Sequence, residues 1–361
     1  MTSVPGTMSA AGEPGWLEWL RRELAPVPGR RAMTLRLVVT VSLVVVVAMA
    51  LQVPEAALSC YMVLFVMKKD RTLTFLTGFL LMIGVTLGIA GSLFLYRFTF
   101  DEPALRVPTM ALVIFIGMYL SRVFFIGPLG FALGFVVAVT QSAADMLPDT
   151  ESLVRSMLWL WVAIVYPIAL SVVVNYVATP ASTRPHEVQA KAKKPVFVRD
   201  ALTNPAHARF ALKVSLAAMA CYIIYTGLDW SGIHTAFITC CFIALETTGA
   251  TLRKGWLRLI GCATGGLLGF LSILYVVPHM ESIVSLVLLT AAVSALAGWV
   301  AAGSEHIAYA GLQIAFAFYM CLFQGFGPGT DLDTIRDRLV GIVLGITITS
   351  VVFHYIWPEE K

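Results

Sequence analysis

The stretch that decides the fold is IHTAFITCCFIALETTGATLRKGWLRLIGCATGGLLG, which runs from Ile233 to Gly269. It joins a short apolar segment, a polar turn and a longer apolar segment that carries spaced glycines. A weaker copy with the same plan occupies residues 55–92. A shift of about 177 residues places Gly84 on Gly261, Gly88 on Gly265, Ser92 on Gly269 and Arg36 on Lys213. A repeat of this length predicts that the chain consists of two related halves.

The short apolar segments are typical of a transporter. Only 13 residues lie between Pro54 and Lys68, and the counterpart from Gly232 to Leu245 has 14. At ~1.5 Å per helical residue each covers roughly 20 Å, against about 30 Å of hydrocarbon. Short segments at matching places in two halves indicate a substrate site. The alternative, weighed equally, is that each helix continues into the polar turn that follows it.

The composition indicates an integral membrane protein. Hydrophobic residues make up 58% and charged residues 13% of the chain, whereas soluble domains carry about 25% charged residues. Periodic strand patterns are absent, so a barrel is not expected. We expect an all-α fold of about twelve transmembrane helices in two parallel six-helix repeats. The apolar segments cover residues 33–51, 54–67, 73–96, 107–120, 123–141, 153–178, 208–228, 232–245, 256–277, 282–301, 306–323 and 338–357.

The distribution of charge predicts the orientation. With both termini in the cytoplasm, 20 of the 25 Lys and Arg residues fall on the inner side, as the positive-inside rule requires. Both halves then enter the membrane from the same side. Four regions follow: a cytoplasmic N-terminal segment with an interfacial helix (1–32), two membrane repeats (33–178 and 208–361) and a solvated cytoplasmic linker (179–207).

Several functional classes lack support in the sequence. The six cysteines all lie in apolar segments and form no CxxC or Cys/His cluster, so we expect no disulfide, metal or cofactor. A phosphate-binding GxxxxGK[ST] loop and a nucleophile elbow are also absent. We therefore expect neither an enzyme nor a nucleic-acid partner. Energy for transport must come from an ion gradient or a partner, or flux must be passive.

Ionisable groups at membrane depth are costly and mark functional candidates. His234 lies at the outer end of a short segment, beside Asp229 and Trp230. Because histidine titrates near physiological pH, we hypothesise that Asp229 and His234 belong to a proton relay. The alternative, a histidine that caps an interfacial helix end, carries slightly more weight.

The inner end of the same segment carries a second group of candidates, Glu246, Arg253 and Arg258. Arginine binds carboxylates bidentately, so these cations suit capture of acidic substrates. The alternative is that they are ordinary positive-inside anchors, and Arg258 is the stronger candidate for a site. Glu305 and His306 open a later segment, where proton transfer and helix capping are weighed equally.

The outer end of the last segment carries Arg336, Asp337 and Arg338, against the positive-inside trend. Pairing of these arginines with Asp337 or with the acidic loop 331–333 and a role in substrate exit are equally plausible interpretations. Glycines four residues apart in three segments predict close helix packing. We expect them to join the two halves, with a homodimer seam as the alternative.

Five motifs resemble the fusaric acid resistance family of inner-membrane efflux proteins, which includes the aromatic acid exporters. The resemblance covers both halves and is nearest to the multidrug-resistance branch of that family. It is carried by GATLRKGWLRLIGCATGGLLG (249–269), LDWSGIHT (228–235), SEH (304–306), IRDR (335–338) and WPEE (357–360).

The resemblance implies proton-driven export of aromatic carboxylic acids or related amphipathic drugs from a Gram-negative cell. It also implies a periplasmic adaptor (membrane fusion) protein and an outer-membrane channel. Such proteins usually carry a sizeable soluble domain between their halves, where this sequence has only the short linker. A passive organic-anion channel and a membrane scaffold for an adaptor protein remain as alternatives.

Overall fold

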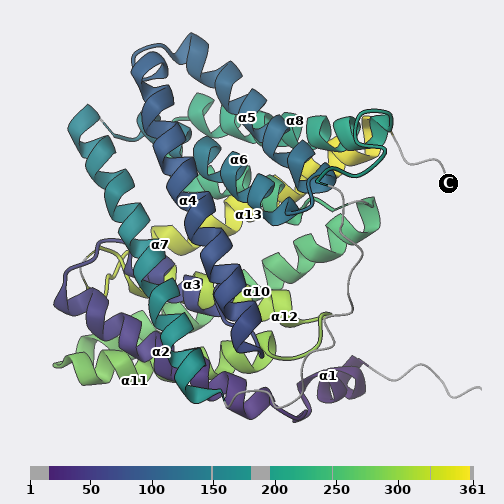
Figure 1. Cartoon of the computed structure of the whole chain (residues 1–361). Coiled ribbons are helices and arrows are strands. Elements are labelled where there is room, and N and C mark those ends of the chain that lie inside the picture. The colour runs from purple at the N-terminus through teal and green to yellow at the C-terminus, as the bar shows by residue number, and fades with distance from the viewer. Residues whose placement is uncertain (1–15, 148, 180–195, 246, 326, 358–361) are drawn as a thin grey trace, which may run out of the picture.

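The computed structural model describes residues 16–147, 149–179, 196–245, 247–325 and 327–357. The segment before Trp16, most of the predicted linker and the candidate Glu246 therefore lie outside the described residues. Within these ranges the regular elements are helices, accompanied by two isolated β-bridges. The all-α prediction is confirmed, and the helices stack side by side in one body (Figure 1).

Nine of the described helices are long and apolar enough to cross a membrane, and three further apolar helices are shorter. The chain is therefore an all-α integral membrane protein, while the exact number of spans remains a prediction. The α-helices are α1 (Trp16–Leu24), α2 (Arg30–Ala50), α3 (Ala56–Val66), α4 (Arg71–Thr99), α5 (Pro103–Val123), α6 (Gly127–Ser142), α7 (Thr150–Ala178), α8 (Pro205–Gly227), α9 (Thr235–Ile243), α10 (Thr248–Tyr275), α11 (Ile283–Ala301), α12 (Ala308–Leu322) and α13 (Asp333–Tyr355). Short 3-10 turns are η1 (Ala143–Asp145), η2 (Ser231–His234) and η3 (Val277–His279).

Several long helices begin earlier than the apolar segments predict, because side chains cap their first turns. The Thr247 hydroxyl accepts from the Ala250 N–H at 3.2 Å, and the Asp149 carboxylate accepts from the Ser152 N–H at 2.7 Å. Such caps satisfy N–H groups that have no partner inside the helix. The polar residues from Thr248 onward are therefore the first turns of α10 rather than part of a turn.

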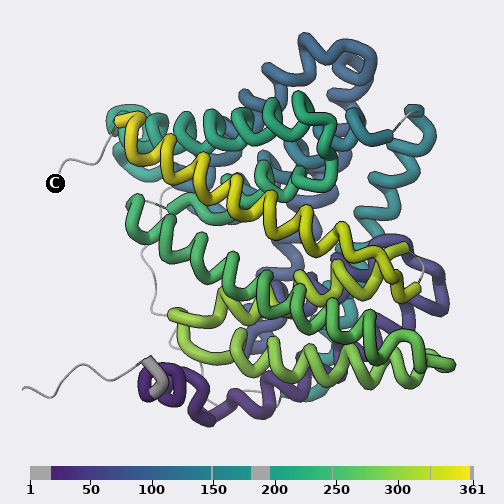
Figure 2. The backbone as a smooth tube through the Cα atoms, turned by 180° about the vertical axis from the view of Figure 1, so that it is seen from behind, coloured from purple at the N-terminus to yellow at the C-terminus, as the bar shows by residue number. Residues whose placement is uncertain are grey.

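The two halves use the same pairs of helices. In the first half α4 packs on α6 and α7, and α3 packs on α7; in the second half α10 packs on α12 and α13, and α9 packs on α13. The halves meet where α2 packs on α11, where α5 packs on α8 and where α3 packs on α12. Figure 2, seen from behind, shows the second half from green to yellow on the nearer side.

The 177-residue shift also holds for individual hydrogen bonds. The Thr74 hydroxyl accepts from the Lys68 N–H at 2.9 Å, and the equivalent Thr251 hydroxyl accepts from the Leu245 N–H at 3.0 Å. Each bond closes the reversal between a short helix and the long helix that follows. Because α3 and α9 end at these reversals, the interpretation in which they continue into the polar turns is wrong.

The spaced glycines pack helices within each half, so the prediction that they join the halves is wrong. A Cβ on Gly88 of α4 would lie 2.8 Å from Val136 of α6, and one on Gly265 of α10 would lie 2.2 Å from the carbonyl oxygen of Ile314 of α12. Gly345 of α13 lies equally close to α9. Since these glycines are covered by neighbouring helices, they do not form a homodimer seam.

We expect Gly265→Ala to destabilise the protein, because the new methyl group would collide with the backbone of Ile314, which cannot move aside as a side chain can. Overpacking of this kind costs about 1–3 kcal/mol. The measurement is thermal unfolding of the purified protein in detergent. Gly249→Ala is the matched control, because no heavy atom lies within 4 Å of its added Cβ. Equal melting temperatures for the two variants would contradict the close approach of α10 and α12.

Candidate functional site

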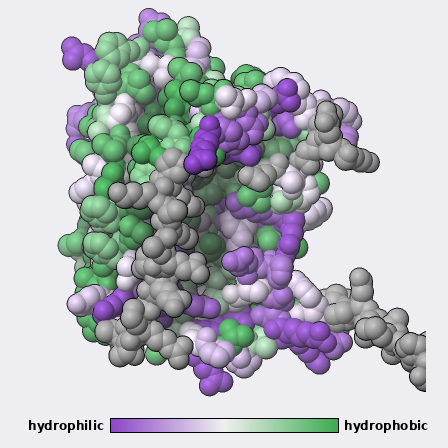
Figure 3. All heavy atoms as spheres, turned by 45° about the vertical axis from the view of Figure 1, so that its right-hand side comes forward, coloured by the Kyte–Doolittle hydropathy of each residue, from purple (hydrophilic) through white to green (hydrophobic). Residues whose placement is uncertain are grey.

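A cavity of about 550 Å³ lies between the two halves. Its walls come from α3, α4, α6 and α7 of the first half and from η2, α9, α10, α12 and α13 of the second. Along α3 the lining extends from Glu55 to Lys68, which corresponds to roughly 20 Å of helix. Figure 3 looks onto the side at the right of Figure 1 and shows a recess with a hydrophobic floor and a hydrophilic rim.

The two halves present equivalent positions to this cavity. The pairs that the 177-residue shift relates and that both line the cavity are Leu58 and Thr235, Tyr61 and Ile238, Phe65 and Phe242, Val139 and Phe316, and Leu81 and Arg258. The last pair breaks the symmetry, because a cation in the second half stands where the first half has a leucine. Equivalent positions of both halves therefore line the cavity, but the residues at these positions differ in charge.

Aromatic side chains form much of the wall. The rings of Tyr61 and Phe316 are 4.3 Å apart between centroids, across the junction of α3 and α12. The ring of Phe242 lies 5.4 Å from Phe131 and 4.8 Å from Phe135, both in edge-to-face geometry. These two groups bring both halves into contact around the cavity and offer flat apolar surfaces to a ligand.

Arg258 of α10 is 2% exposed and is held only by neutral acceptors. Its Nε donates to the Thr239 hydroxyl at 3.1 Å, and its Nη1 donates to Gln313 Oε1 at 3.0 Å and to the Tyr309 hydroxyl at 3.3 Å. Its Nη2 is buried without a hydrogen-bond partner. Three neutral contacts therefore fix the guanidinium, and one of its nitrogens is left unsatisfied.

Arg338 of α13 is 7% exposed and stacks on the Phe316 ring, 4.1 Å from its centroid. Its Nε and Nη2 are buried without a partner. Nε and Nη2 form one edge of the guanidinium, which is the edge that binds a carboxylate with two parallel hydrogen bonds. Among the described residues neither Arg258 nor Arg338 forms an ion pair with a carboxylate, although the two cations lie within electrostatic range of each other.

The structure thus brings together two predicted residues, Arg258 and Arg338, that the sequence assigns to opposite ends of the membrane. His234 lines the same cavity, where its Nδ1 lies 2.9 Å from the Ser231 carbonyl oxygen. An unpaired buried cation is strongly destabilising, so this cavity is suited to an anion.

The other candidates lie outside the cavity lining. Asp229 is exposed in a left-handed turn (φ 51°) and makes no hydrogen bond with His234 in the described part of the chain. Arg336 pairs with Asp333 at 3.0 Å and with Asp337 at 2.8 Å, as the pairing interpretation expects. Its guanidinium also lies 5.7 Å from the Trp230 ring.

The candidates at the other end of these helices are exposed. Arg253 hydrogen-bonds His306, and both side chains are exposed together with Glu305. They link the second turn of α10 to the residues that precede α12. The predicted proton-transfer and capture roles of these residues stay predictions.

Sequence reasoning missed the aromatic wall and the residues that hold Arg258. The repeat could have indicated part of the aromatic wall, because Phe65 and Phe242 occupy equivalent positions in the two halves. Gln313 was also visible as an amide inside an apolar segment. No local pattern indicates that Gln313 and Tyr309 face Arg258, since the contact depends on the packing of α10 against α12.

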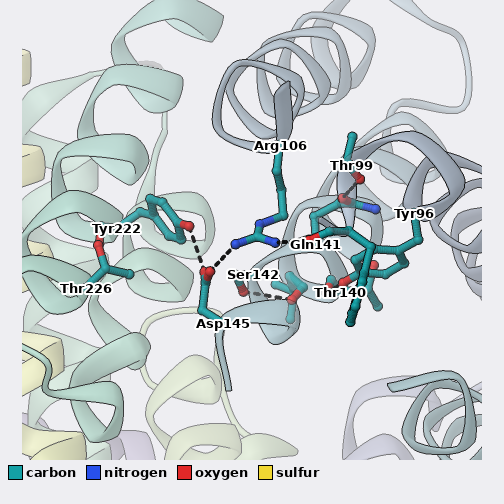
Figure 4. A network of polar contacts seen from close by, with 11 residues as sticks. Tyr96, Thr99, Arg106, Thr140, Gln141, Ser142, Asp145, Tyr222 and Thr226 are labelled. Carbon is teal, nitrogen blue, oxygen red and sulfur yellow. Dashed lines mark hydrogen bonds and ion pairs between the residues drawn. The ribbon is translucent and has the colours of Figure 1, made fainter. Parts of the chain in front are cut away.

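A separate polar cluster ties the halves together away from the cavity (Figure 4). Asp145 of η1 pairs with Arg106 of α5 and accepts from the Tyr222 hydroxyl of α8 at 2.7 Å. Arg106 also donates to the Phe100 carbonyl oxygen at 3.0 Å. One carboxylate therefore joins two elements of the first half to a helix of the second half.

Fold and cavity together define an integral membrane protein with an anion-suited cavity between two halves. Residues 218–352 match the family model described as "Fusaric acid resistance protein-like". A region of 171 residues is 39% identical to multidrug resistance protein MdtO of Escherichia coli strain K12, of E. coli O157:H7 and of Shigella flexneri. That region is 47% of this chain and 25% of each relative's length. No solved structure matches.

The family match lies in the second half of the chain, where it supports the resemblance that the sequence motifs indicate. The match covers only about a quarter of the length of MdtO. Any activity suggested by that relative is therefore only proposed for this chain.

We expect Tyr222→Phe to lower the melting temperature, because it removes a hydrogen bond to the partly buried Asp145 carboxylate. Hydrogen bonds to charged groups contribute about 1.5–3 kcal/mol. Thermal unfolding in detergent measures the change, and Tyr355→Phe is the control because Tyr355 is 75% exposed. If both variants have the melting temperature of the wild type, Tyr222 does not stabilise the junction of the halves.

Proposed function

We propose that this chain forms the membrane part of an efflux transporter that moves small aromatic or amphipathic carboxylic acids through the central cavity. The observation that carries the proposal is the pair of buried arginines, Arg258 and Arg338, which line a cavity with aromatic walls and have N–H groups without a hydrogen-bond partner. The family and the "multidrug resistance" name of the relatives support a transporter rather than an enzyme.

The cavity fits such a substrate in shape and chemistry. Its volume of about 550 Å³ falls in the usual range for small-molecule sites, roughly 300–1,000 Å³. A carboxylate would bind the Nε and Nη2 edge of Arg338 and the Nη2 of Arg258, while the organic body lies against Phe316 and Phe242. Burial in this apolar surrounding strengthens each charged hydrogen bond.

We place the chain in a bacterial inner membrane, in the lipid bilayer, with both termini in the cytoplasm. In this orientation Arg253, Lys254 and His306 lie at the cytoplasmic side, where they would attract acidic substrates. Lys254 packs 5.2 Å from the Tyr309 ring, next to the residue that holds Arg258. Protons are proposed to drive export through His234, which lines the cavity. A periplasmic adaptor and an outer-membrane channel complete the proposed assembly.

We expect Arg338→Gln to weaken benzoate binding tenfold to a hundredfold, because it removes a charge-assisted hydrogen-bonding edge worth about 1.5–3 kcal/mol. Arg338→Lys keeps the charge but loses the bidentate edge, so an intermediate loss is expected. Equilibrium binding of radiolabelled benzoate to purified protein measures both. Arg155→Gln is the control, because Arg155 is exposed and pairs with Glu151. Unchanged affinity in Arg338→Gln would refute this assignment of the site.

Transport is tested in proteoliposomes loaded with benzoate, with and without an imposed pH gradient. We expect uphill movement only with the gradient, and loss of that dependence in His234→Ala. Downhill movement alone in the wild type would indicate a passive channel. A His234→Ala variant that retains full gradient-dependent transport would remove His234 from the proposed proton path.

A further inference from the structure

The two buried arginines of the cavity carry charge that no carboxylate of the described structure neutralises. Arg258 and Arg338 are 2% and 7% exposed, and three of their nitrogens are buried without a partner. Gln313 accepts a hydrogen bond from Arg258 through its amide oxygen. The amide nitrogen of Gln313 is also buried without a partner. Two arginines that line a ligand-sized cavity, and the Gln313 side chain that holds one of them, therefore carry four buried donor atoms without a partner.

The protein cannot remove this charge by losing a proton. Arginine remains protonated at any physiological pH, unlike lysine or histidine. The acceptors that hold Arg258 are hydroxyl and amide oxygens, which carry no charge. Isolated buried charges cost several kcal/mol each unless a counter-charge is present.

The other ionisable groups of the lining do not supply that counter-charge. Glu55 is the carboxylate among the described lining residues, and it is exposed and makes no hydrogen bond to either arginine in the described part of the chain. Lys68 and His234 also line the cavity but can carry only positive charge. The counter-charge must therefore come from solution.

We propose that a small inorganic anion of the size and charge of chloride occupies the Arg258–Arg338 pair whenever no organic anion is bound. An anion beside the two guanidinium groups supplies the acceptor that Arg258 Nη2 and Arg338 Nε and Nη2 lack. The same pair is the proposed substrate site, but this inference does not depend on transport. A carboxylate must displace the anion, so its binding is an exchange of one anion for another.

Two measurable effects follow. An anion that binds only the folded protein raises its stability with concentration. The apparent affinity for a carboxylate falls as the inorganic anion increases, because both ligands compete for the same donors. General screening by salt affects exposed charges, so the ionic strength must be kept constant while the anion is exchanged.

The experiment uses the full chain purified in detergent in sodium fluoride, with chloride replacing fluoride at constant ionic strength. Fluoride is the comparison anion because it carries no carboxylate and is more strongly hydrated than chloride. We expect the melting temperature of the wild type to rise with chloride, and the apparent Kd for benzoate to increase at least threefold between 1 and 150 mM chloride. Both effects should shrink in Arg338→Gln and persist in Arg155→Gln.

The wild-type titration keeps the proposal testable even if Arg338→Gln fails to fold, because ³⁵Cl NMR line broadening by wild-type protein reports bound chloride directly. Broadening that benzoate reverses supports the proposal. A melting temperature and benzoate affinity that are equal in chloride and fluoride would overturn it and leave the proposed substrate site intact. Chloride binding without any binding of organic acids would support the inference and refute the proposed function.

Discussion

The confinement of two arginines in an apolar cavity, without a carboxylate partner in the described structure, is the constraint on which the rest of the site depends. Arg258 is fixed by Thr239, Tyr309 and Gln313, which orient it without neutralising it. Arg338 is fixed by its contact with the Phe316 ring. An acidic residue in place of one of these neutral partners would form a permanent ion pair with the arginines. Neutral acceptors and an aromatic face leave the charge for a ligand.

Residues at equivalent positions of the predicted repeat line the same cavity. Phe65 and Phe242 are one such pair. The exchange of Leu81 for Arg258 between the halves places a buried cation on the side of the second half that has no counterpart at the equivalent position of the first. A ligand with one acidic and one apolar end matches that asymmetry better than a symmetric one.

Close packing within each half leaves room for the cavity between them. Glycines on α4 leave room for side chains of α6, and glycines on α10 allow the backbone of α12 to approach closely. The short helices α3 and α9 are terminated by hydrogen bonds to Thr74 and Thr251. Asp145 forms an ion pair with Arg106 and accepts a hydrogen bond from Tyr222, and these contacts join the halves at a separate place from the two arginines of the cavity. Rigid halves joined at separate seams are a suitable framework for a transporter.

The sequence by itself determined the membrane class, the helical content, the 177-residue repeat and the short helices, because hydropathy, helix capping and spacing are local properties of the chain. It also marked Arg258 and Arg338 as costly charges in apolar segments. Only the tertiary structure decided that these two arginines share one cavity, that glycines pack within each half, and that Gln313 and Tyr309 hold Arg258. These outcomes depend on which helices pack together and on how each is rotated about its axis, and residues distant in the chain decide both.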